Sequence, residues 1–119
     1  TRENTGVRFN VAMNYGGQDE LTRAMQKIAR KVRDGELAPE AIDGHIIEGE
    51  LDTAGIPPVD FVIRTSGDLR LSNFLLWQAA YAEFWFTQTN WPDFTPACFV
   101  EALLDFGQRQ RRFGGLKNK

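Results

Sequence analysis

The sequence of 119 residues lacks several features that mark particular classes of protein. Its one cysteine, Cys98, excludes an internal disulfide and suits a reducing compartment. Its one histidine, His45, has no second histidine or cysteine beside it and does not indicate a zinc site. The longest apolar stretch, from Phe74 to Phe86, contains Gln78 and Glu83 and is too short to cross a bilayer. With no signal-peptide pattern either, we expect a cytoplasmic location.

The chain also lacks an excess of positive charge. Its 14 basic and 16 acidic residues give a net charge of −2, so no overall basic field would hold nucleic acid or an anionic membrane. A Walker-type glycine-lysine loop and an aromatic-basic platform are absent as well, which disfavours a nucleotide-binding or RNA-binding module. Any affinity for phosphate must therefore be local, and no nucleic-acid partner is expected.

What is present is a hydrophobic content of 42%, enough for one modest core, arranged in alternating strand and helix patterns. Strands joined by helical crossovers imply parallel pairing, so the fold class predicted is α/β, a parallel sheet flanked by helices. The predicted strands are Val7–Asn14, Val59–Ile63 and Phe84–Thr87, and the predicted helices are Asp19–Asp34, Pro39–Leu51, Phe74–Tyr81 and a last one from a Thr95 cap to about Arg112.

The stretch from Asp60 to Glu83 concentrates charged and polar side chains around one short strand. Arg64 directly follows that strand, at the edge of an open α/β sheet where ligands bind. Ser72 or Asn73 is predicted to cap the helix after it, leaving backbone N–H groups directed toward the arginines. Two guanidiniums beside a helix N-terminus would make an anion site. The simpler alternative is that Arg64 and Arg70 form ordinary ion pairs with Asp60, Asp68 or Glu83.

Four blocks of the sequence carry a family resemblance. The central block, R-T-S-G-D-x-R-x-S-N-F-L-L-W-Q-x-x-Y-x-E-F from Arg64 to Phe84, resembles the signature of the cis-prenyltransferases, the undecaprenyl diphosphate synthase family. The same family is matched in order by Asn14–Gly17, Trp91–Phe94 and Arg111–Gly115. One departure is Asp68, where many relatives carry glutamate, and it keeps the charge.

The resemblance implies a magnesium-dependent transferase that adds isopentenyl diphosphate to an allylic prenyl diphosphate with Z geometry and releases pyrophosphate. It also implies that residues 1–119 are the C-terminal half of a single domain. The chain begins without methionine, and nothing in it matches the half that carries the allylic-diphosphate loop and an essential aspartate. We therefore expect no catalytic residue in this segment and no activity from it alone, and at most peripheral membrane contact through the lipid product.

The resemblance also assigns residues. Arg64, Arg70 and Ser72 would hold isopentenyl diphosphate with the backbone of Leu71 close by, and Glu83 would help to ligate Mg²⁺. Arg112 and Gly114 match an R-x-G element that reaches the diphosphate site of a partner subunit, which implies a homodimer. The alternative is a noncatalytic partner subunit of a cis-prenyltransferase complex. Such subunits usually lack the diphosphate-binding residues, which are present here.

Overall fold

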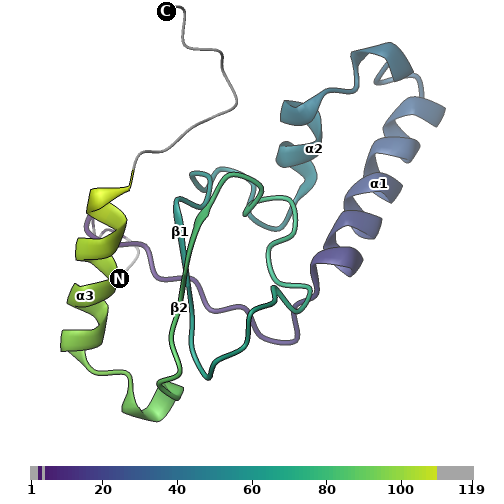
Figure 1. Ribbon diagram of the computed structural model, residues 1–119. Helices are drawn as coiled ribbons and strands as arrows, with labels where there is room; N and C mark the ends of the chain where they lie inside the picture. Colours follow the sequence, from purple (N-terminus) through teal and green to yellow (C-terminus); the bar gives the residue numbers. More distant parts are fainter. Residues whose placement is uncertain (1–2, 4, 110–119) are drawn as a thin grey trace, which may run out of the picture.

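The computed structural model describes residue 3 and residues 5–109 of the chain (Figure 1). The two strands β1 and β2 pair in parallel, with Phe61 opposite Glu83 and Arg64 opposite Phe86. In Figure 1, α3 lies on one side of the strand pair, and α1 and α2 lie together on the other. The predicted α/β class with parallel strands is confirmed. The elements are α1 (Gly17–Arg33), the 3₁₀ turn η1 (Pro39–Ala41), α2 (Gly44–Glu50), β1 (Phe61–Arg64), β2 (Glu83–Phe86), the 3₁₀ turn η2 (Trp91–Asp93) and α3 (Pro96–Gln108).

The amphipathic helix predicted from Asp19 to Asp34 is α1. It buries Ala24 and Ile28, and its basic face is solvated and ion-paired, as expected of cations near a helix C-terminus. Arg23 makes two bonds of 2.7 and 2.6 Å to the carboxylate of Asp52, which tie α1 to the segment after α2. Exposed ion pairs of this kind add little stability each. No helix in the described part of the chain is both long and apolar enough to cross a membrane.

A buried carboxylate lies where α1 meets the rest of the chain. Glu20 is 1% exposed and accepts hydrogen bonds from the Tyr15 hydroxyl, the Asp52 backbone N–H at 2.9 Å and the Gln78 amide at 3.0 Å. Burial, and then the bond to Glu20, raises the pKa of the Tyr15 hydroxyl above its ordinary value. These four residues, the Glu20 cluster, join three separate segments because a buried carboxylate needs donors from several directions.

The last helix begins as predicted. Thr95 caps α3, its hydroxyl accepting from the Cys98 backbone N–H, with proline at the first helical position. The Phe106 ring packs on Phe61 of β1 with centroids 4.6 Å apart. The expected apolar face turned to a core is only partly found, because Ala102 is buried whereas three larger side chains are exposed. Those three are Phe99, Leu103 and Leu104. Within the described residues α3 ends at Gln108, before the expected Arg112.

One prediction near the start of the chain is wrong, and one in the middle is only partly confirmed. Residues 7–14 form no strand, and Val7 and Phe9 are 98% and 86% exposed. Alternation alone does not make a strand, since a strand needs a hydrogen-bonded neighbour, and the sheet in the described residues contains only β1 and β2. The helix predicted from Pro39 to Leu51 is divided into η1 and α2, because Asp43 caps a new helix by accepting from the Ile46 N–H at 2.9 Å.

The helix predicted from Phe74 to Tyr81 is also wrong. The segment consists of turns, and Ser72, Asn73 and Leu75 have φ angles of 51°, 64° and 47°. Positive φ is incompatible with a right-handed helix. The side chain of Asn73 does accept from a helix N-terminus, but from that of α1, whose Gln18 N–H donates to it at 2.8 Å. No helix N-terminus formed by this segment is therefore directed toward the arginines.

Because Glu20 is buried and accepts from three groups, we expect truncation of its side chain to cause a large loss of stability. Glu20→Ala removes the shared acceptor and leaves the Gln78 amide and the Tyr15 hydroxyl without it, so we expect the free energy of unfolding to fall by about 2–4 kcal/mol. Urea unfolding of the protein that contains this chain measures the change. Glu40→Ala, at an exposed position, is the control and should change stability by less than about 0.5 kcal/mol. Equal, small effects of both variants would contradict the role given to Glu20.

Candidate functional site

Arg64 is the last residue of β1, so the sheet fixes its backbone, and the loop that follows returns past it. Arg64 Nη2 donates to Asp68 Oδ2 at 2.9 Å, and Arg70 Nη2 donates to Asp68 Oδ1 at 2.7 Å. One carboxylate thus holds two guanidiniums side by side. The Arg64 guanidinium, with Arg70 adding to its effect, holds the pKa of Asp68 below its ordinary value.

Ser72 completes this group. Its hydroxyl accepts from Arg64 Nη2 at 3.3 Å. The side chains of Arg64 and Arg70 remain 32% and 70% exposed, so both cations are open to solvent. The structure therefore brings together the three side chains that the sequence singled out, and it selects Asp68 from the three acids proposed as their ion-pair partners. Arg64, Asp68, Arg70 and Ser72 are called the arginine cluster below.

The loop of the arginine cluster is fixed to the segment that follows β2. The backbone N–H groups of Ser66 and Gly67 donate to the carbonyls of Thr89 and Thr87, both at 2.9 Å. Gly67 has a φ of +72°, and a Cβ there would meet the Gln88 side chain at 2.3 Å. Glycine enters this backbone region without strain, which suits it to the turn.

A small apolar cleft lies beside the arginine cluster. It has a volume of about 190 Å³, and Arg64, Arg70 and Leu71 form part of its wall. Its remaining lining is apolar and comes from both strands and the turn segment: Val62, Ile63, Phe84, Phe86 and Phe74. Cations next to an apolar hollow suit a ligand with an anionic head and a short hydrocarbon tail.

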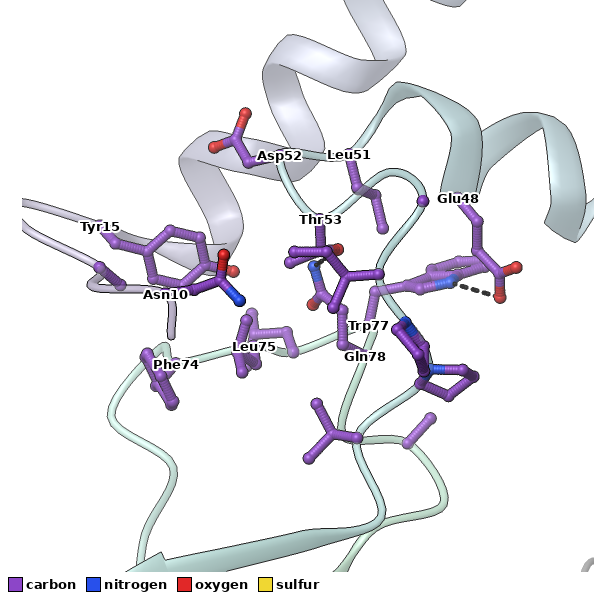
Figure 2. A pocket seen from close by; sticks show the side chains of 18 of the residues that line it. Asn10, Tyr15, Glu48, Leu51, Asp52, Thr53, Phe74, Leu75, Trp77 and Gln78 are labelled. Carbon is purple, nitrogen blue, oxygen red and sulfur yellow. Dashed lines mark hydrogen bonds between the residues drawn. The ribbon is translucent and has the colours of Figure 1, made fainter. Parts of the chain in front are cut away.

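A larger pocket, of about 1350 Å³, lies near the other end of β1 (Figure 2). Figure 2 shows Tyr15, Phe74, Leu75 and Gln78 around it, with Trp77 bonded to Glu48 on one side. Among the described residues, its lining contains one cation, Arg23, which Asp52 already holds. The pocket exceeds the usual size of a small-molecule site, and its described lining offers no pair of cations to bind a diphosphate. The arginine cluster is the better candidate.

Glu83 does not join the arginine cluster. It is the first residue of β2 and lies opposite Phe61, three residues before Arg64 along the paired strand, or about 10 Å at 3.3 Å per residue. Its carboxylate accepts from Arg109 Nη1 at 3.1 Å, and that nitrogen also donates to the Phe84 carbonyl at 2.8 Å. The sequence suggested Arg70 as its structural partner. Arg109 was not singled out from the sequence as a partner of Glu83. It does lie four residues after Asp105, the spacing of a helical ion pair, and it forms that ion pair as well.

Comparison with known proteins adds the decisive observation. The family model described as "Putative undecaprenyl diphosphate synthase" matches residues 1–114. The chain belongs to this family. An isoprenyl transferase of Brucella abortus is 53% identical over 117 residues, which are 98% of this chain and 46% of that protein. Dehydrodolichyl diphosphate synthase 2 of Arabidopsis thaliana is 52% identical, and the match covers 99% of this chain and 39% of that protein.

A solved structure agrees with the family and the fold. Lavandulyl diphosphate synthase from Lavandula x intermedia, crystallised with dimethylallyl diphosphate, superposes with a TM-score of 0.92 at 41% identity. The match covers 96% of this chain and 49% of that one. The chain thus spans about half the length of the proteins it matches.

In this member of the undecaprenyl diphosphate synthase family, the described residues do not form a metal site by themselves. They contain no group of three or more histidine, cysteine, aspartate or glutamate side chains that could hold an ion. Glu83 offers one carboxylate, already paired with Arg109, whereas Mg²⁺ needs six oxygens and usually takes several from water and phosphate. The metal role of Glu83 stays a prediction. Arg112 and Gly114, assigned to the partner's site, lie outside the described residues.

The position of Asp68 between two arginines leads to a prediction about its pKa. Because both guanidiniums stabilise its charged form, the pKa of Asp68 should lie below the ordinary aspartate value of about 3.9. The ion pairs of the loop should persist above about pH 4 and be lost as the pH falls through the lowered pKa. Carbon-detected NMR of the Asp68 carboxyl as a function of pH measures this pKa. Arg64→Gln should move the pKa of Asp68 back up, and an ordinary value in the parent protein would contradict the bridge.

Proposed function

We propose that the protein containing this chain is a Z-specific isoprenyl transferase, which condenses isopentenyl diphosphate with an allylic prenyl diphosphate and releases pyrophosphate. The chain provides the isopentenyl diphosphate site, formed by Arg64, Arg70, Ser72 and the backbone of Leu71. The observation that carries this proposal is the pair of arginines held on one carboxylate beside an apolar cleft. The names of the relatives support the reaction class.

The proposed binding mode follows from the chemistry of the arginine cluster. A guanidinium presents its N–H groups in a planar fork that matches the oxygens of a diphosphate in charge and spacing. The Ser72 hydroxyl adds a donor next to Arg64. The five-carbon isopentenyl group would enter the cleft between β1, β2 and Phe74. Holding the nucleophilic double bond in one orientation supplies the proximity that a condensation of two substrates requires.

The chain is proposed to be the C-terminal half of one domain, with the allylic-diphosphate loop and the essential aspartate in the remainder. The share of the relatives' length that it covers supports this. The exposed apolar side chains of residues 7–13 support it too, because a stretch this apolar is ordinarily covered. Those side chains are Val7, Phe9, Val11 and Met13.

Further parts of the proposal concern assembly and location. A homodimer in the cytoplasm would place Arg112 and Gly114 of each subunit at the diphosphate site of the other. Magnesium would bind mainly through substrate phosphates and water, with Glu83 as the candidate ligand from this chain. A noncatalytic partner subunit is the less favoured alternative, because Arg64, Arg70 and Ser72 are not only present but adjacent.

The first functional prediction concerns the two arginines. In the full-length enzyme, Arg64→Ala and Arg70→Ala should each weaken use of isopentenyl diphosphate by about 1.5–3 kcal/mol, the worth of a charged hydrogen bond, which is at least tenfold in KM. Steady-state kinetics at saturating allylic substrate measures it. Arg30→Ala, an arginine on the exposed face of α1, is the control and should behave like the parent. A parental KM in either cluster variant would remove that arginine from the site.

The second concerns Glu83 and magnesium. Glu83→Gln and Arg109→Gln both break the same ion pair, but only the first removes a carboxylate. If Glu83 is a ligand, the magnesium concentration for half-maximal activity should rise in Glu83→Gln, with the fold kept, and should not rise in Arg109→Gln. A titration of activity with Mg²⁺ on both variants decides between the roles. Equal shifts, or none, would assign Glu83 to a structural ion pair between β2 and Arg109, the residue that follows α3.

A further inference from the structure

The turns at Ser72–Leu75 take an unusual backbone path directly beside the arginine cluster. Three of the four residues have positive φ, and none of them is glycine. Such conformations persist only where the surrounding structure holds them, and they gather at ligand-binding sites. Ser72, the first residue of this segment, contacts Arg64, so whatever holds the segment also positions Ser72 in the arginine cluster.

The holding contacts come from the N-terminus of α1. The Gly17 N–H donates to the Asn73 carbonyl at 2.7 Å, and the Gln18 N–H donates to Asn73 Oδ1 at 2.8 Å. The first N–H groups of a helix have no partner within the helix, so one residue satisfies two of them. Asn73 has a φ of 64°, and asparagine is one of the few residues that enter this region readily.

We propose that Asn73 is a positioning residue for the isopentenyl diphosphate site, which fixes Ser72 beside Arg64 by binding the N-terminus of α1. This inference rests on the proposed function. Asn73 does not touch the ligand in this proposal. It acts through its neighbour. Because its carbonyl and its side chain are both bound to a helix end, Asn73 is held in place, and this restricts the movement that would withdraw the Ser72 hydroxyl from Arg64.

The helix end is itself well anchored and closely packed against the segment. Glu20, one turn into α1, binds Gln78 further along the same segment. A Cβ built on Gly17 would lie 2.8 Å from Leu76 Cγ and 3.1 Å from the Asn73 carbonyl oxygen. Position 17 must therefore be glycine for the helix end to come this near, and a methyl group there would push the segment away.

Two substitutions at Asn73 separate its hydrogen bond from its backbone conformation. Asn73→Gly keeps positive φ but loses the bond to Gln18, and Asn73→Ala loses both. In the full-length enzyme we expect KM for isopentenyl diphosphate to rise roughly tenfold in Asn73→Gly, about the worth of one hydrogen bond, and further in Asn73→Ala. KM for the allylic substrate should stay within about twofold. A parental KM for isopentenyl diphosphate in Asn73→Gly would overturn the proposal, as would equal rises for both substrates.

A substitution on the helix side approaches the same contact without altering Asn73. Gly17→Ala and Gly44→Ala are matched, because each changes the first residue of a helix, but a Cβ on Gly44 would have no neighbour within 4 Å. Gly17→Ala should raise KM for isopentenyl diphosphate severalfold, and Gly44→Ala should not. Thermal unfolding of both checks that the variants fold. A folded Gly17→Ala enzyme with a parental KM would contradict the proposal.

A double substitution of Asn73 and Ser72 tests whether Asn73 affects substrate binding through Ser72. If Asn73 acts through Ser72, the rise in KM caused by Asn73→Gly should shrink in a Ser72→Ala background, whereas independent effects would multiply and refute that route. Arg64→Ala in the same assay keeps the two proposals apart. If Arg64→Ala leaves KM unchanged, Arg64 is not part of the proposed isopentenyl diphosphate site, and the premise of the role of Asn73 fails with it. If Arg64→Ala raises KM and Asn73→Gly does not, only the role of Asn73 fails.

Discussion

The buried carboxylate of Glu20 is the contact on which the arrangement of the chain depends. Ion pairs on the surface, such as that of Arg23 with Asp52, tie α1 to the segment after α2 but add little each. Glu20 instead collects donors from Tyr15, Asp52 and Gln78, and a buried charge fixes the geometry of every group that satisfies it. The position of α1 follows from this contact, and with it the helix end against which Asn73 lies.

The sequence predicted those parts of the fold that depend on local pattern. The spacing of apolar residues gave α1, short β-branched and aromatic runs gave β1 and β2, and Thr95 with Pro96 gave the start of α3. Residues 7–14 alternate as well as either strand, yet a strand exists only with a partner, and pairing is a property of distant residues. Pattern alone therefore separates a strand from an extended coil poorly.

In the candidate site, too, the partners of single side chains depend on distant residues and could not be predicted from local pattern. Ser72 or Asn73 was predicted to cap a helix starting at Phe74, and that prediction is wrong. Asn73 instead binds the start of α1, 56 positions earlier in the chain at Gly17, and no local rule selects that partner. Three acids were open as partners of Arg64 and Arg70, and only the path of the loop selects Asp68. Glu83 belongs to the same sequence block as Arg64, but the strand register separates the two along the sheet.

The ion pairs of Asp68 with Arg64 and Arg70 would also affect how an anion binds to the arginine cluster. Two guanidiniums and one carboxylate leave the cluster with a net charge of +1 instead of +2. In the proposed diphosphate site, long-range steering of the anion would be correspondingly weaker, and the incoming oxygens would compete with Asp68 for the two guanidiniums. The carboxylate of Asp68 would pair with both arginines again when the anion leaves.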